Sequence, residues 1–133
     1  MLDLEGLEVR LIHVGQCHRI GDTIVYVPAE GVVFAGGVIF SKCTPMGCCG
    51  SCSKRLQALD LTLWLDPDVI VPGHGPVCGI ESAMDMKAFV EYVRDESRRC
   101  FDQGLNALEA AKRIEFGPYR EWRSPTRGIE VEF

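Results

Sequence analysis

Two histidines, each in a glycine-containing turn that follows a run of β-forming residues, are the side chains best suited to chemistry. His18 precedes a Gly-Asp-Thr turn, and His74 lies in the segment Pro-Gly-His-Gly-Pro. Neutral imidazole is a preferred ligand of zinc and of other transition metals, and zinc binds four ligands. We therefore expect His18 and His74 to lie at one rim of a sheet, within reach of a common zinc ion. The missing ligands would be water, Cys17, Asp22, a residue of the 43–52 loop or a second copy of the chain.

Asp22 has two possible roles. In a Gly-Asp-Thr turn the carboxylate can accept hydrogen bonds from backbone N–H groups, and we favour this structural role. As the carboxylate nearest to His18 in the sequence, it is also the candidate catalytic residue for a metal-bound water. His13 lies within an apolar stretch, which is typical of a hydrogen-bonded core histidine rather than a ligand.

Cysteine is unusually abundant. The chain has seven cysteines, an odd number, and no secretion signal, which favours reduced thiols or metal ligands over a disulfide framework. Cys49 and Cys52 have the CxxC spacing that can chelate a metal or close a reactive disulfide. Two interpretations stay open for the four cysteines that crowd into one loop: a second thiol or metal site, or incidental thiols. These four are Cys43, Cys48, Cys49 and Cys52.

Composition limits the remaining classes. A chain of 133 residues fits one domain, residues 1–133, and its 47% hydrophobic and 25% charged content is ordinary for a globular protein. The net charge of −5 argues against nucleic acid as a partner. No apolar run approaches the ~20 residues that span a bilayer, and Asp3 and Glu5 do not suit a signal peptide. We expect a cytoplasmic protein that does not bind membranes.

The elements that must position the histidines follow from periodicity. Helical spacing of leucines indicates a helix near 53–65, and an apolar stripe indicates a longer helix near 81–103. Asn106 and Glu109 form a predicted capping box that opens a short helix. The tail, residues 119–133, has no clear periodicity, so its order is uncertain. We predict an α/β fold with a small mixed sheet whose helices cover one face and whose strands are Val9–Val14, Thr23–Val27, Val32–Ala35 and Val69–Val71.

The segments HVGQCHRIGDTIVYVPAEGVVFAGGVIF and DPDVIVPGHGPV resemble the C-terminal half of a metallo-β-lactamase-superfamily hydrolase. The family pattern is a metal-binding histidine before a Gly-Asp-Thr strand, then FxGD, then PGHG, and the match runs from about Val9 to Tyr92. The resemblance implies that His18 is the third-motif ligand and that His74 is the last one. The chain departs from the pattern at Gly37, where the family has the metal-bridging aspartate, and it lacks the HxHxDH motif.

The family fold implied by this resemblance is an αββα sandwich of two similar halves, of which a truncated chain would supply one. Its uncovered sheet face would expose Val25, Val27, Val33, Phe34 or their neighbours, and we expect a sheet-to-sheet homodimer to cover it. Three functions stay open: a zinc-dependent hydrolase of ester-type small molecules with an incomplete metal site, a non-catalytic metal- or thiol-binding homodimer, and a degenerate fragment without chemistry. If the histidines bind zinc, Gly37→Asp should raise the zinc affinity.

Overall fold

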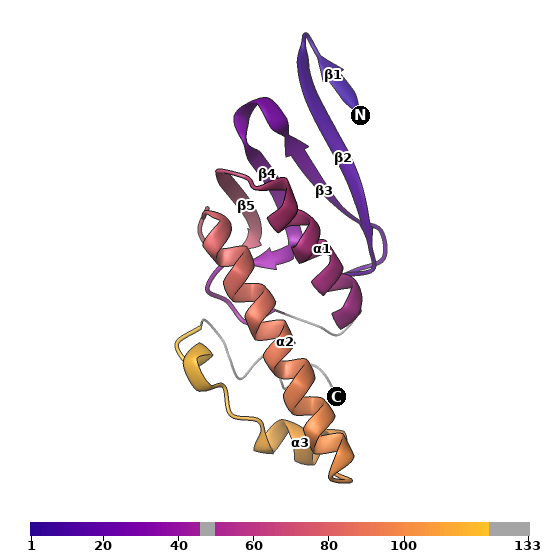
Figure 1. The fold of residues 1–133 in the computed structure, drawn as a ribbon, viewed down its shortest axis with the longest axis vertical. Coiled ribbons are helices and arrows are strands. Elements are labelled where there is room, and N and C mark those ends of the chain that lie inside the picture. The colour runs from indigo at the N-terminus through magenta and orange to yellow at the C-terminus, as the bar shows by residue number, and fades with distance from the viewer. Residues whose placement is uncertain (46–49, 123–133) are drawn as a thin grey trace.

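A five-stranded sheet forms the centre of the computed structural model, which describes residues 1–45 and 50–122. The strands lie in the order β1-β2-β3-β4-β5, with antiparallel pairing up to β4 and parallel pairing of β4 with β5. The four predicted strands are confirmed, each somewhat longer than expected, and β1 was missed (Figure 1). Their bounds are Leu2–Leu4 (β1), Leu7–Gly15 (β2), Asp22–Val27 (β3), Val32–Phe40 (β4) and Val69–His74 (β5).

The parallel pair requires a crossover, and helix α1 (Cys52–Leu65) supplies it. Ser51 caps its start by accepting a hydrogen bond from the backbone N–H of Lys54. Asp66 ends it in the left-handed region, with φ of 47°, directly before Pro67. The helix predicted near 53–65 is thus confirmed, and it ends here because a residue before proline is pushed out of the α region.

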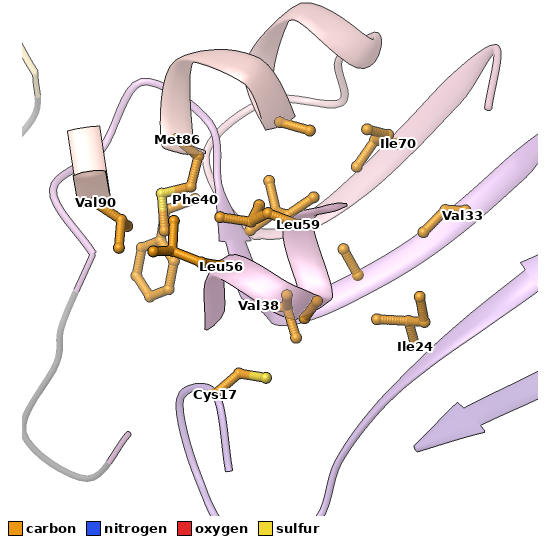
Figure 2. Packing of buried hydrophobic residues seen from close by; sticks show 14 of the residues in the cluster. Cys17, Ile24, Val33, Val38, Phe40, Leu56, Leu59, Ile70, Met86 and Val90 are labelled. Carbon is orange, nitrogen blue, oxygen red and sulfur yellow. The ribbon is translucent and has the colours of Figure 1, made fainter. Parts of the chain in front are cut away.

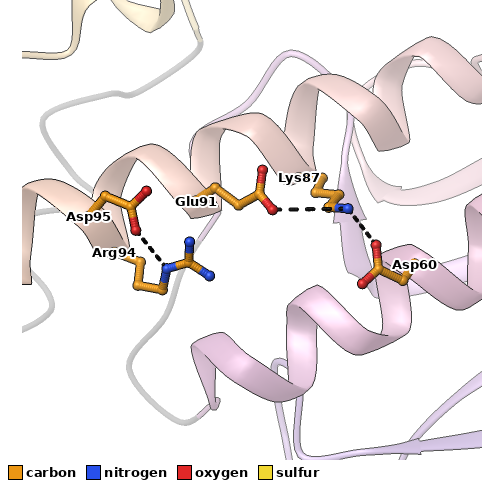
Figure 3. A network of polar contacts seen from close by, with 5 residues as sticks. All are labelled: Asp60, Lys87, Glu91, Arg94 and Asp95. Carbon is orange, nitrogen blue, oxygen red and sulfur yellow. Dashed lines mark hydrogen bonds and ion pairs between the residues drawn. The ribbon is translucent and has the colours of Figure 1, made fainter.

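Helices α2 (Ile80–Asp102) and α3 (Ala107–Arg113) complete the fold, with short 3₁₀ turns at Pro28–Glu30 and Gly117–Tyr119. The predicted capping box of α3 is present, since Asn106 and Glu109 each accept a hydrogen bond from the other's backbone N–H. The helices α1 and α2 lie on the same side of the sheet (Figure 1). A surface ion pair between Lys87 of α2 and Asp60 of α1, 2.6 Å, joins them (Figure 3).

The core lies between this pair of helices and the sheet (Figure 2). Burial of branched and aliphatic side chains on one strand face and one helix stripe provides the main stabilisation, about 1.5–3 kcal/mol for each large side chain. The strands contribute Ile24, Val33, Val38 and Ile70, and the helices contribute Leu56, Leu59, Met86 and Val90. No helix in the described part of the chain is long and apolar enough to span a membrane.

The sheet face that the helices leave uncovered, which we call the open face, carries apolar side chains. Residues opposite each other in paired strands point to the same face. Leu11 is half-exposed at 50% and Phe34 at 47%. Successive pairs of opposite residues form an apolar row across four strands, through Leu11, Val25, Phe34 and Val71.

The β1–β2 hairpin projects past α1 (Figure 1). Apolar side chains continue along one of its faces. Apolar residues alternate with Glu8 and Arg10 along β2. Leu2 and Leu4 of β1 pair with apolar residues of β2, so they lie on the open face, and both are exposed. The charged side chains Glu8 and Arg10 therefore lie on the opposite side of the hairpin.

Two of the four residues expected on the uncovered face are not exposed there. Val33 is fully buried at 0% exposure because it alternates with Phe34 along β4 and points towards the helices. Val27 is also buried. Val25 is half-buried and Phe34 is exposed, so the expectation holds for these two.

Of the tail at 119–133, the structure describes residues 119–122. Tyr119 and Trp122 both pack on Phe89 of α2, with ring centroids 5.0 and 5.1 Å away. The rest of the tail lies outside the described residues.

Candidate functional site

Phe40, at the end of β4, contacts both predicted histidines. Its ring stacks on His74 with centroids 4.4 Å apart, and His18 meets it edge-on at 5.6 Å. The two imidazole centroids are therefore no more than about 10 Å apart, the sum of these distances. His18 is half-buried in the turn before β3, and His74 is exposed at the end of β5. The structure brings both to one rim of the sheet, whereas a shared metal ion stays a prediction.

Glycines allow β5 to approach its neighbour closely enough to place His74. A β-carbon on Gly73 would lie 2.5 Å from the carbonyl oxygen of Gly36, and one on Gly75 would lie 2.0 Å from the carbonyl oxygen of Ser41. Gly75 also has a φ of +89°, which only glycine adopts readily. The backbone N–H of Ser41 donates to the carbonyl of His74 at 2.9 Å and fixes this approach.

The imidazole of His18 occupies the space above Gly37. A β-carbon on Gly37 would lie 2.4 Å from Cδ2 of His18. An aspartate at position 37, as in the family pattern, therefore needs the His18 ring to move. Gly37→Asp cannot simply add an oxygen ligand beside His18 in its present position.

Arg55, in the first turns of α1, is the site residue that sequence reasoning missed. It is only 4% exposed, and its Nη2 lies 3.3 Å from Nδ1 of His18. Its Cζ also lies 5.9 Å from the ring centroid of Phe40. The available signal was its place in the apolar stripe of α1, four residues before Leu59.

The contact with Arg55 determines the hydrogen-bonding role of His18. A guanidinium has only donors, so Nδ1 of His18 accepts and a neutral ring carries its proton on Nε2. A metal-bound histidine has the opposite arrangement, with one nitrogen on the metal and the other donating its N–H to an acceptor. The permanent positive charge of Arg55 also disfavours a cation at this position.

Asp22 holds the His18 turn in place. Its Oδ2 accepts the backbone N–H groups of Cys17 and Arg19, at 3.0 and 2.9 Å, and that of His18. The favoured structural role is confirmed. A catalytic role stays a prediction, and one oxygen of the carboxylate is already fully engaged in the turn.

Cys17 is a core residue, 1% exposed, whose side chain Figure 2 shows at the edge of the hydrophobic cluster. Its thiol donates to the carbonyls of Val14 and Lys54, at 3.2 and 3.4 Å. Burial, with the nearby charge of Asp22, raises the pKa of the Cys17 thiol. Because a metal ligand is a thiolate, this geometry supports a protonated, structural cysteine.

The other sequence candidates form no metal-binding group in the described residues or lie outside them. Cys43 is half-buried, and Cys52 is exposed at the start of α1. Cys48 and Cys49 lie outside the described residues. His13 is exposed on the open face rather than in the core, because it follows Leu11 by two residues along β2.

These residues do not fit a zinc site as they stand. Within residues 1–45 and 50–122, no three histidine, cysteine or acidic side chains come together in a way that could hold a metal ion. His18 accepts from Arg55, Cys17 is a buried thiol, and Asp22 binds backbone N–H groups. Zinc binding by four ligands would need several of these contacts to break.

Solved metallo-β-lactamases resemble this chain. The metallo-β-lactamase from Pontibacter korlensis aligns with a TM-score of 0.61 at 18% identity, over 68% of this chain and 44% of that one. TMB-1 aligns with a TM-score of 0.57 at 19% identity, over 66% and 42%. FIM-1 from Pseudomonas aeruginosa, in its mono-zinc form, aligns with a TM-score of 0.55 at 22% identity, over 62% of this chain and 39% of that one. No family model and no curated protein sequence matches.

At sequence identities of 18–22%, the structural likeness to these metallo-β-lactamases shows the fold. The chain has part of the metallo-β-lactamase fold, as its motifs indicated, and it spans less than half the length of these three structures.

Proposed function

We propose that this chain is an assembly subunit, a partial metallo-β-lactamase-type sandwich that binds a second copy of itself through the open face. The observation that carries the proposal is the apolar row on that face, with Leu11 and Phe34 about half exposed. Exposed apolar patches that extend over several strands mark interaction surfaces in soluble proteins. The β1–β2 hairpin extends this surface with Leu2 and Leu4.

A second copy suits this face because a two-fold interface pairs a surface with itself. Glu8 and Arg10 of β2 point to the other side of the sheet. The central apolar row carries no charge, so two copies can meet there without like-charge repulsion. Two sheets packed face to face, about 10 Å apart, would bury the side chains that the single chain leaves exposed.

The proposal assigns no hydrolytic step to the rim of His18 and His74. Hydrolysis through a metal-bound water needs an open metal position and a base. In the described residues, Nδ1 of His18 accepts from the Arg55 cation and Asp22 stabilises a turn. The His74 ring stacks on Phe40, the last residue of β4, which gives this histidine an apolar packing partner.

Gel filtration with light scattering, with and without a chelator, tests the proposal. The single chain has a mass of 14.7 kDa. We expect twice this mass in both conditions, because the interface is apolar and needs no metal. A monomer across the micromolar range contradicts the proposal. A dimer that dissociates on addition of chelator would instead support the alternative of a metal shared between copies.

A further inference from the structure

A cavity of about 720 Å³ lies away from the histidine rim, between α2, α3 and residues 44–45. Figure 1 shows α3 and the second half of α2 extending beyond the sheet, so the cavity does not belong to the open face. Its volume falls within the range of about 300–1,000 Å³ that small-molecule sites occupy. A cavity of this size is large enough for an organic ligand.

The walls of the cavity are largely apolar. Helix α2 contributes two aromatic rings, Phe89 and Phe101, and the segment after α3 contributes Phe116. Helix α3 lines the opposite side with Ala107, Ala110 and Ala111, whose short side chains do not fill the space next to α2. An apolar cavity holds water poorly, so it favours an apolar chain as its occupant.

Two polar features at the cavity indicate the head group of such a ligand. Arg94 pairs with Asp95 at 2.8 Å (Figure 3), whereas Arg98, one helical turn on, makes no ion pair with any of the described residues. Thr44, also in the wall, has a buried hydroxyl that makes no hydrogen bond in the described part of the chain. A buried hydroxyl without a partner is unfavourable and would be stabilised by an acceptor.

We propose that this cavity binds a single-chain amphiphile with a carboxylate head group, that is, a free fatty acid. The acyl chain lies between the aromatic rings and the alanine face of α3. The carboxylate accepts from the Arg98 guanidinium and, after rotation about χ1, from the Thr44 hydroxyl. The surplus positive charge of Arg98 selects an acid over the corresponding neutral alcohol.

Isothermal titration of the whole chain with dodecanoate and with dodecanol, below their aggregation concentrations, tests this site. The wild type should bind one dodecanoate per chain and should prefer it to dodecanol at least tenfold. Arg98→Gln should reduce this preference at least fivefold. The matched control is Arg113→Gln, because Arg113 is a charged residue of α3 outside the cavity wall. It should leave both affinities unchanged.

Ala110→Phe tests the position of the acyl chain, because a phenyl ring would occupy the space next to α2. Binding of both ligands should weaken at least tenfold, with far-UV circular dichroism unchanged. Absence of saturable dodecanoate binding by the wild type overturns the proposal. The proposal is also overturned if Arg98→Gln leaves the preference for dodecanoate over dodecanol unaltered. This second test does not depend on a substitution in the apolar walls of the cavity.

Discussion

Leu11→Gln is the substitution that most sharply probes the open face. Leu11 lies at the start of the apolar row and is 50% exposed in the single chain. Leu108 of α3 is a matched control, because it is 52% exposed and lies on a helix away from the sheet. The two substitutions remove the same side chain at the same exposure, so only the proposed interface distinguishes them.

The magnitude follows from the area that remains to be buried. Full burial of a leucine is worth about 1.5–3 kcal/mol, so burying the exposed half in a dimer contributes about 1 kcal/mol. Each copy contributes once, which gives about 2 kcal/mol for the two-fold dimer. Since 1.4 kcal/mol corresponds to a factor of ten, the dissociation constant should rise about 30-fold. Desolvation of the glutamine amide would add to this effect.

Sedimentation equilibrium over a dilution series measures the dissociation constants of the wild type and both variants. Leu11→Gln should raise the constant about 30-fold, and Leu108→Gln should change it less than twofold. Equal constants for the two variants would refute the placement of the interface on the open face, provided that circular dichroism shows both to be folded.

Three further predictions concern the histidine rim. Asp22→Ala should lower the free energy of unfolding by about 2 kcal/mol, because three backbone N–H groups lose a charged acceptor; urea unfolding measures this, and no change would contradict the assigned role. Burial raises the pKa of the Cys17 thiol, so the folded state holds its proton more tightly than the unfolded state, and stability should fall as the pH rises above the thiol's ordinary value of 9.0. Urea titrations should show a smaller fall in Cys17→Ala, and equal falls would argue against a buried thiol. Gly37→Asp should displace the His18 ring and leave zinc affinity as weak as in the wild type, measured by competition with a chromophoric chelator; tight zinc binding would show that the rim can become a metal site.

Local patterns predicted most of the fold because each element carries its own boundary signal. Pro28 and Gly31 limit β3 and β4, and Asp66-Pro67 ends α1. The strand β1 was missed because its hairpin turn is Glu5-Gly6, with φ values of 55° and 91°. A two-residue turn of this kind usually has asparagine or aspartate first, so the glutamate concealed it.

The extension of β4 and the Arg55 contact depend on tertiary structure. Gly36-Gly37 indicates a bend, yet pairing with β5 carries the strand on to Phe40. The meeting of His18 and His74 could be predicted, since each follows a strand of one sheet. The cation beside His18 could not, because Arg55 reaches it from a helix 37 residues later in the chain.

The most direct test of the proposed assembly is an isotope-filtered NOE experiment on a mixture of labelled and unlabelled protein. In a dimer that packs one open face on the other, the Leu11 and Val25 methyl groups of one copy should show intermolecular NOEs to open-face side chains of its partner, such as the Phe34 ring. Intermolecular NOEs confined to exposed helix residues such as Trp64 and Met84, or no intermolecular NOEs at millimolar concentration, would contradict the account.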